Sequence, residues 1–201
     1  MRGIRRVLSN ARIYELLQQV LGGAQARSTL VREHVRPYSG ARVLDLGCGP
    51  GDLLRYLGDV QYVGIDTSDA YIEQAQRSLG NRGEFRVGDA RSLDSNLHGF
   101  DFVLAFGVLH HLDDSGAESL IRGASAALSP AGRFVSVDPT LIPHQRRAAR
   151  VVVSWDRGGC VRDPEEYGRL VESTFENVRR TVRSDLLRIP YTHCVVEARA
   201  V

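Results

Sequence analysis

Lysine is missing from this chain of 201 residues, because all 26 of its basic residues are arginine. A guanidinium stays protonated in proteins, so the sequence excludes a lysine Schiff base and a lysine general base. The 24 acidic residues nearly balance the arginines and leave a formal net charge of +2. This balance gives no general argument for a nucleic-acid partner, and we expect none.

Cysteine and long apolar runs are also scarce. Cys48, Cys160 and Cys194 are too few and too far apart for a disulfide framework or a zinc site. We expect reduced thiols in a cytoplasmic protein without a metal. No apolar run reaches the ~20 residues that span a bilayer, and the arginine-rich N-terminus lacks the apolar segment of a secretory signal.

The hydrophobic share of 43% and the charged share of 25% are ordinary for a globular protein, and we expect one domain over 1–201, as a monomer or a homodimer. Apolar runs alternate with helical patterns, which predicts a parallel sheet covered on both faces. The expected strands cover 41–46, 60–65, 84–87, 100–105 and 133–138, and the expected helices cover 52–58, 69–79 and 115–128.

The two ends of the chain differ from this core, which we place at 41–138. Residues 10–36 carry two helical patterns, and we expect residues 1–40 to form a helical lid. Within 163–201, Asp163 and Pro164 predict a helix start with Glu166 three residues after the cap. The runs 176–188 and 191–199 are joined so closely that they predict an antiparallel hairpin.

One short segment is especially informative about function: residues 43–51 read VLDLGCGPG. An apolar run ends there and breaks into glycines at 47, 49 and 51, and a helical pattern begins after Asp52. This order predicts a strand, a glycine-rich turn and a helix N-terminus. Free backbone amides and the helix dipole at such a turn favour an anionic group.

The glycine spacing differs from the G-x-G-x-x-G pattern of dinucleotide-binding turns. Asp52 follows the third glycine, and its carboxylate is unfavourable beside a pyrophosphate. Asp45 adds a second negative charge to the same crevice. A ligand with one carboxylate, one ammonium, one sulfonium and no phosphate suits this balance, which favours S-adenosylmethionine over a nicotinamide dinucleotide.

Polar groups also follow the ends of the next predicted strands, which meet at one edge of a parallel sheet. Asp66 and Thr67 follow the second strand, Asp89 and Ala90 the third, and Phe106 the fourth. Asp66 can accept hydrogen bonds from two ribose hydroxyls. Asp89 can accept from an adenine amino group, and the Ala90 amide can donate to a ring nitrogen. Each acid alone is equally explained as a helix cap or a turn residue.

Together these segments resemble the successive motifs of class I S-adenosylmethionine-dependent methyltransferases of the small-molecule type. The resemblance rests on residues 43–51, 63–66, 88–90, 100–111 and 128–133. It implies a three-layer, Rossmann-like α/β fold with a seven-stranded, mostly parallel sheet and an antiparallel C-terminal hairpin. It also implies S-adenosylmethionine as the cofactor and S-adenosylhomocysteine as the product. The cofactor-binding residues that follow are Asp45, Gly47, Cys48, Gly49, Gly51, Asp66, Thr67, Asp89, Ala90 and Phe106.

Methyl transfer from a sulfonium needs mainly the alignment of nucleophile, methyl group and leaving sulfur. A general base helps only when the acceptor is a weak nucleophile such as a hydroxyl. Two candidates stand at suitable places: His110 after the fourth strand, and His193, which shares one face of the last strand with Tyr191. Either histidine can equally serve packing or positioning alone.

Residues 139–162 have no counterpart among these motifs, and in this fold the connection after the fifth strand usually covers the acceptor. Its arginines, at 146, 147, 150, 157 and 162, indicate either an anionic acceptor or a solvated helix face.

The acceptor that we expect is a small molecule, such as a biosynthetic intermediate or a sugar. Residues 105–108 lack the Asn/Asp-Pro-Pro-Tyr-like turn that many enzymes methylating protein or nucleobase nitrogen carry after the fourth strand. The alternatives are a methyltransferase acting on protein or RNA, a non-catalytic S-adenosylmethionine-binding protein and a nicotinamide dehydrogenase. The dehydrogenase is disfavoured by Asp52 and by the antiparallel tail.

Overall fold

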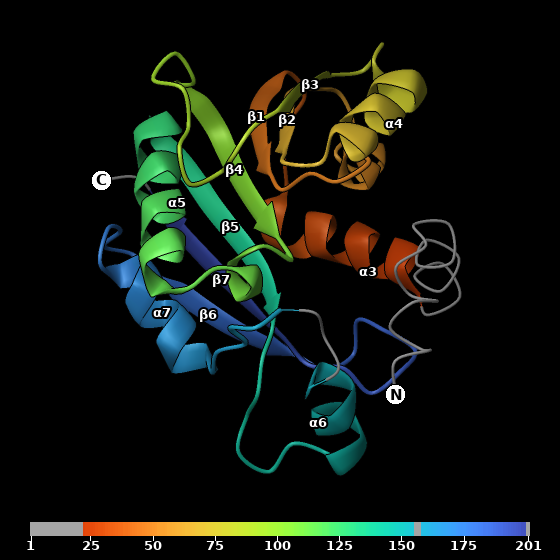
Figure 1. The fold of residues 1–201 in the computed structure, drawn as a ribbon, viewed down its shortest axis with the longest axis vertical. Helices are drawn as coiled ribbons and strands as arrows, with labels where there is room; N and C mark the ends of the chain where they lie inside the picture. Colours follow the sequence, from red (N-terminus) through yellow and green to blue (C-terminus); the bar gives the residue numbers. More distant parts are fainter. Residues whose placement is uncertain (1–21, 155–157, 200–201) are drawn as a thin grey trace.

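The computed structural model describes residues 22–154 and 158–199 and contains a seven-stranded sheet flanked by helices (Figure 1). Its strands are β1 (Ala41–Leu46), β2 (Val60–Asp66), β3 (Glu84–Val87), β4 (Phe100–Phe106), β5 (Leu128–Pro139), β6 (Arg179–Arg183) and β7 (His193–Arg199). Its helices are α3 (Gly23–Leu30), the π-helix η1 (Val31–Val35), the 3₁₀ helices η2 (Asp52–Tyr56) and η3 (Leu109–His111), α4 (Asp69–Leu79), α5 (Asp114–Ala127), α6 (Arg147–Ser154) and α7 (Pro164–Glu172). The part of the predicted lid up to residue 21 lies outside the described residues.

The strands follow the order β3-β2-β1-β4-β5-β7-β6 across the sheet. β1 to β5 pair in parallel, whereas β7 runs antiparallel to both β5 and β6. The predicted seven-stranded, mostly parallel sheet with an antiparallel hairpin is therefore confirmed. The strand order reverses between β1 and β4, and ligands of open α/β sheets bind at the carboxyl side of such a point.

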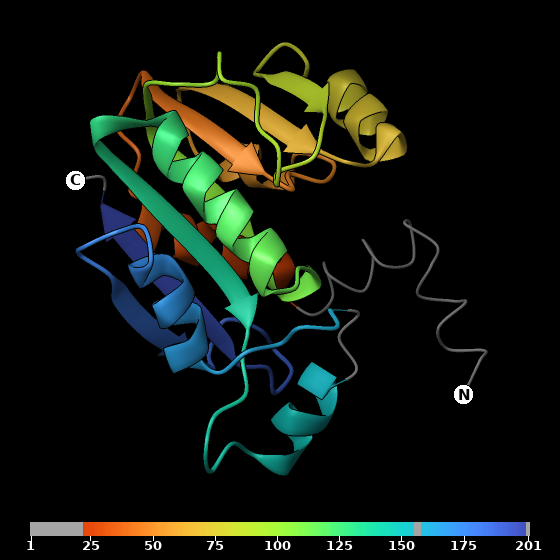
Figure 2. The same cartoon turned by 60° about the vertical axis from the view of Figure 1, so that its left-hand side comes forward.

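The central strands are continuous apolar runs because helices cover both of their faces. Val43 and Leu104 pack in one core, which α3, η1 and α4 cover. Leu44 and Val103 pack in the other core, which α5 and α7 cover. The views in Figure 1 and Figure 2 show these helices on opposite sides of the sheet. The predicted three-layer architecture is thus present.

Four predicted elements differ in kind or extent. The helix expected over 52–58 is the five-residue 3₁₀ helix η2. The strand expected over 133–138 begins earlier, at Leu128. The two C-terminal strands are shorter than expected because residues 184–192 form their connection, and Pro190 in that connection has no N–H to donate to a strand ladder.

The predicted start of α7 is confirmed as a capping box. Asp163 Oδ1 accepts a hydrogen bond from the Glu166 amide at 2.8 Å, and Glu166 Oε2 accepts one from the Asp163 amide at 2.8 Å. Pro164 occupies the first turn, where its missing N–H costs nothing. This cap fixes where the chain leaves the segment 139–162 and returns to the sheet.

The described part of the predicted lid is held to the rest of the protein by ion pairs. Arg27 of α3 lies 3.7 Å from Asp52 of η2, so α3 flanks the helix that follows the glycine turn. His34 of η1 lies 2.6 Å from Glu197 of β7 and is buried. These contacts connect α3 and η1 to both halves of the sheet.

Candidate functional site

The glycine turn follows β1 and begins with two amides that bond to the neighbouring strand. Gly47 N and Cys48 N both donate to the Ile65 carbonyl of β2, at 2.7 and 3.0 Å. Gly47 has φ +70°, and a Cβ there would lie 2.5 Å from Val108 Cγ2. Gly49 has φ +54°, but nothing lies within 4 Å of the Cβ position. Gly47 therefore permits close packing, whereas Gly49 leaves open space beside its backbone.

Asp66 ends β2 and joins this turn. Its Oδ2 accepts a hydrogen bond from Gly49 N at 2.9 Å, and its Oδ1 accepts one from Ser68 N at 2.9 Å. An ionised carboxylate has about four acceptor positions, so each oxygen keeps capacity for another donor. The structure thus places Asp66 beside the glycine turn, as the sequence predicts, and Thr67 next to it is exposed.

Asp45 lies behind the turn and is buried, with 2% of its surface exposed. The Tyr62 hydroxyl of β2 donates to Asp45 Oδ2 at 2.6 Å. Burial raises the pKa of Asp45 to about 7, although the Tyr62 hydrogen bond opposes this shift; the charge of Asp66 adds to it. The carboxyl group therefore changes charge near neutral pH.

Cys48 points its thiol into the core behind the turn. The residue is 8% exposed, and Sγ donates weakly to the Gly49 carbonyl at 3.5 Å. Burial, with the charges of Asp45 and Asp66, raises the pKa of the thiol. Only the Cys48 backbone is thus suited to a ligand, and all three cysteines are free thiols in the structure.

The remaining predicted cofactor residues follow β3 and β4. Asp89 is partly exposed and forms an ion pair with Arg91, whose Nη2 lies 2.6 Å from Asp89 Oδ2. Ala90 packs against the core beside it. Phe106 ends β4, and the next amide, of Gly107, donates to the Val137 carbonyl of β5 at 2.7 Å. These residues end neighbouring strands, so they lie along the same edge as the glycine turn and Asp66.

His110, the first candidate base, forms a buried pair with Asp138 of β5. His110 Nδ1 lies 2.8 Å from Asp138 Oδ1, and the His110 amide donates to the same oxygen at 3.2 Å. The two residues are 4% and 1% exposed. Asp138 Oδ2 is buried, and no residue within 22–154 and 158–199 donates a hydrogen bond to it. A carboxylate on one ring nitrogen fixes the tautomer and orientation of a histidine.

The segment after α6 covers this pair. Cys160 N donates to the His110 carbonyl at 3.0 Å, and a Cβ on Gly158 would collide with the His110 ring. α6 itself lies beyond the carboxyl end of β5 in both ribbon views (Figure 1 and Figure 2). From the sequence we expect residues 139–162 to cover the acceptor, and in the structure Gly158 and Cys160 of this segment pack against His110. Trp155 and Arg157 lie outside the described residues.

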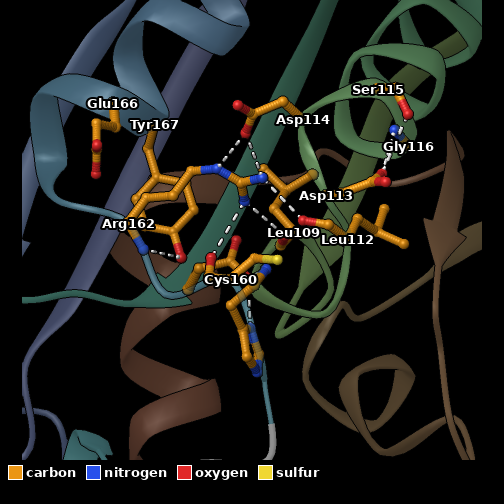
Figure 3. Close-up of polar contacts among 12 residues, drawn as sticks. Leu109, Leu112, Asp113, Asp114, Ser115, Gly116, Cys160, Arg162, Glu166 and Tyr167 are labelled. Carbon is orange, nitrogen blue, oxygen red and sulfur yellow. Dashed lines mark hydrogen bonds and ion pairs between the residues drawn. The ribbon is translucent and has the colours of Figure 1, made fainter.

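Arg162 holds that segment in place (Figure 3). Its guanidinium donates to Asp114 twice, at 3.1 and 2.8 Å, and to the carbonyls of Leu109, Cys160 and Leu112 at 2.9, 3.2 and 2.8 Å. These five bonds match the five N–H donors of an arginine. Arg162 is buried and saturated, so it belongs to the structural framework rather than to an anion-binding set.

His193, the second candidate base, lies elsewhere. It opens β7 and pairs in register with Pro139, whereas Asp138 pairs with Cys194. Successive residues of a strand point to opposite faces, so His193 and Asp138 face different sides of the sheet. The His193 ring lies 4.7 Å from the Tyr191 ring, but Tyr191 precedes β7, so the predicted shared strand face is not present. The structure does not bring His110 and His193 together.

Two side chains that shape this site escaped sequence reasoning. Asp138 ends an apolar strand just before Pro139, which is the same signal that identified Asp66. Tyr62 sits inside an apolar run, and its contact with Asp45 depends on the register of β1 and β2. Within 22–154 and 158–199, no cluster of His, Cys, Asp and Glu is arranged to hold a metal ion. No helix in these ranges is long and apolar enough to cross a bilayer.

Known proteins share both the motifs and the fold. Residues 43–132 match the family described as methyltransferase domain. The 27-O-demethylrifamycin SV methyltransferase of Amycolatopsis mediterranei is 34% identical over 113 residues, which cover 52% of this chain and 41% of that protein. The probable tRNA methyltransferase 9B of Mus musculus is 31% identical over 127 residues, covering 61% and 28%. The chain thus spans less than half the length of these relatives.

Among solved structures, magnesium protoporphyrin IX methyltransferase from Synechocystis has the same fold. It superposes with a TM-score of 0.72 over the full length of both chains at 18% identity, and its structure holds S-adenosylhomocysteine. The motif match and the strand order agree with the resemblance of the sequence motifs. Residues 43–132 therefore match a methyltransferase domain, and the described residues have the fold of a solved methyltransferase.

Proposed function

We propose that this protein transfers a methyl group from S-adenosylmethionine to a small-molecule acceptor. The observation that carries the proposal is the open backbone of Gly49 beside the Asp66 carboxylate. These groups stand at the carboxyl ends of β1 and β2, next to the point where the strand order reverses.

The residues present fit this cofactor. A side chain at position 49 would occupy the open space that a ligand needs. Both oxygens of Asp66 keep acceptor capacity for ribose hydroxyls. When bound, S-adenosylmethionine supplies a methyl group that its sulfonium already activates. The protein therefore has to bind, align and exclude water.

The pair of His110 and Asp138 supplies a candidate base for a hydroxyl acceptor. An ionised carboxylate only accepts hydrogen bonds, so Asp138 favours the tautomer in which Nδ1 carries the proton and Nε2 is basic. The same arrangement would stabilise the imidazolium after Nε2 takes a proton. Asp138 is a positioning residue in this proposal. His193 remains the alternative on the other face of the sheet.

A small acceptor is favoured over protein or RNA. One relative is named as a methyltransferase of the rifamycin series, and the turn after β4 lacks the Asn/Asp-Pro-Pro-Tyr-like sequence. The probable tRNA methyltransferase among the relatives is the specific reason to keep an RNA acceptor as the second candidate.

Calorimetry with S-adenosylhomocysteine tests the cofactor assignment. Asp66→Asn keeps the shape of the side chain and removes its charge, and we expect about tenfold weaker binding or more, because hydrogen bonds to a charged group contribute about 1.5–3 kcal/mol. Asp69→Asn, which neutralises an exposed acid of α4, is the matched control and should bind normally. Equal affinity of the Asp66 variant, or binding of NADH in place of S-adenosylhomocysteine, would overturn the proposal.

Acceptor screening with mass detection tests the class of acceptor and the role of the pair of His110 and Asp138. For a hydroxyl acceptor, Asp138→Asn should lower kcat by about 10²–10⁴-fold and leave the affinity for S-adenosylhomocysteine unchanged. A variant with normal kcat would show that the pair serves packing alone. Methylation of tRNA, but of no small molecule, would favour the second candidate.

A further inference from the structure

A cavity of about 260 Å³ lies at the end of the sheet away from the glycine turn. Arg133 of β5, which lines it, is in register with Phe102 of β4, and Phe102 is in register with Val43 near the start of β1. The glycine turn follows the other end of β1, four residues or ~13 Å along the strand from Val43. The residues that line the cavity are Arg36, Arg133, Asn177, Arg179, Glu197, Ala198 and Arg199.

Strand register places like charges opposite each other in this cavity. Arg133 of β5 pairs directly with Arg199 of β7. Arg179 of β6 pairs with Glu197 of β7, two residues from Arg199 and therefore on the same face. Like charges directly opposite each other on antiparallel strands are destabilising, so the pairing of Arg133 with Arg199 lowers local stability. Such conflicts are expected where a site serves a ligand.

The acid in the cavity does not neutralise these arginines. Glu197 is shared between His34, at 2.6 Å, and Arg133, at 3.0 Å. Arg36, Arg179 and Arg199 form no side-chain hydrogen bond or ion pair with the described part of the chain. Burial lowers the pKa of Arg133 although Glu197 opposes this, and the charges of Arg36 and Arg199 lower it further. Within the described residues, three guanidiniums thus line the cavity without an ion-pair partner.

The backbone of Arg36 supplies a second, independent signal. Arg36 ends η1 in the left-handed region, with φ 52° and ψ 56°. Residues other than glycine rarely adopt this conformation, and a residue before proline is pushed toward extended backbone. Pro37 follows directly. Strain of this kind persists where the position of the side chain matters.

We propose that this cavity binds a phosphate group, as inorganic phosphate or as the phosphomonoester of a small molecule. Guanidinium groups bind phosphate through paired hydrogen bonds, and several of them around one anion match its several oxygens better than the two oxygens of a carboxylate. The cavity is slightly smaller than the ~300 Å³ at which pockets for drug-sized ligands begin, which suits a small anion. S-adenosylmethionine carries no phosphate, and the cavity lies at the end of the sheet away from the glycine turn. The proposed phosphate site is therefore separate from the cofactor crevice.

Two variants test the site. Arg36→Asn removes one guanidinium and introduces a residue that tolerates the left-handed conformation. Arg199→Gln removes one of the two arginines that face each other across β5 and β7. Arg77→Gln is the matched control, because Arg77 is an exposed arginine of α4 whose one ion-pair partner among the described residues is Glu73 of its own helix. All three lose one positive charge.

Thermal unfolding and calorimetry at constant ionic strength are measured with sodium chloride, inorganic phosphate and phenyl phosphate. In chloride, we expect the Arg36 and Arg199 variants to unfold at the same temperature as the wild type or higher. In phosphate, the unfolding temperature of the wild type should rise above that of both variants. Each variant should bind phosphate at least about tenfold more weakly than the wild type. The Arg77 variant should respond like the wild type.

The proposal fails if the wild type responds to phosphate no more than to chloride, or if the Arg36 and Arg199 variants keep the full response. Tighter binding of phenyl phosphate than of inorganic phosphate would identify a phosphomonoester as the ligand; the reverse would identify the free ion. Binding of S-adenosylhomocysteine should be unchanged in both variants, so this result is independent of the methyltransferase assignment.

Discussion

The buried carboxyl group of Asp45 gives the stability of this protein a pH dependence that one substitution removes. Burial raises the pKa of Asp45 from 3.8 to about 7 in the folded protein. In the unfolded chain the group titrates at about 3.9. The folded state therefore holds a proton that the unfolded state has lost between these values, and its stability falls as the pH rises through this window.

The size of the effect follows from the two pKa values. One pKa unit corresponds to about 1.4 kcal/mol, so Asp45 lowers the free energy of unfolding by at most about 4 kcal/mol between pH 4 and pH 8. Asp45→Asn keeps an acceptor for the Tyr62 hydroxyl and cannot ionise. We expect the variant to match the wild type near pH 3, below both pKa values, and to be more stable by several kcal/mol near pH 8.

Urea unfolding followed by circular dichroism across this pH range measures the difference. Asp69→Asn is the control, because it removes the charge of an exposed carboxyl group of α4. A stability difference between wild type and Asp45→Asn that does not change with pH would refute the reasoning, because it would mean that Asp45 has the same pKa in both states.

Other predictions concern the glycine turn and the Arg162 framework. Gly47→Ala should destabilise the protein by more than ~1–2 kcal/mol, because its Cβ would lie 2.5 Å from Val108 Cγ2 at a positive φ. Gly49→Ala should cost only the ~1–2 kcal/mol of backbone strain, yet weaken S-adenosylhomocysteine binding more strongly, which calorimetry can check. Arg162→Met should cost about 1–3 kcal/mol in urea unfolding for each buried carbonyl oxygen that it leaves unpaired. Asp114→Asn removes its exposed partner and should cost about 1 kcal/mol or less.

The sequence predicted what depends on local pattern. Continuous apolar runs predicted the parallel strands because both faces of the sheet are covered. The alignment of strand ends predicted that Asp66 would stand beside the glycine turn, and Gly49 N indeed donates to Asp66 Oδ2 at 2.9 Å. Cap chemistry predicted the start of α7 because Asp163 and Glu166 act within a single turn. In each case, the residues that determine the structure are close in sequence or follow a topological rule.

Features that depend on contacts between distant segments were not predicted. Arg162 belonged to a set of arginines in the sequence, but its partners come from residues 109–114, about 50 positions earlier. Asp45 was predicted to direct its charge into the crevice, whereas the register of β1 and β2 places it under the Tyr62 hydroxyl. The arginine cavity draws on η1, β5, β6 and β7, and no sequence pattern marks it.

The net charge of +2 conceals an uneven distribution of charge along the sheet. Acids stand at the carboxyl side of the parallel strands: Asp66 ends β2, Asp89 follows β3, and Asp138 lies next to the end of β5. Arginines surround the cavity at the opposite end. An acidic crevice repels a pyrophosphate and attracts a cationic ligand, whereas the arginine cavity does the reverse. The same argument that favours a sulfonium cofactor at one end of the sheet therefore favours a phosphate at the other.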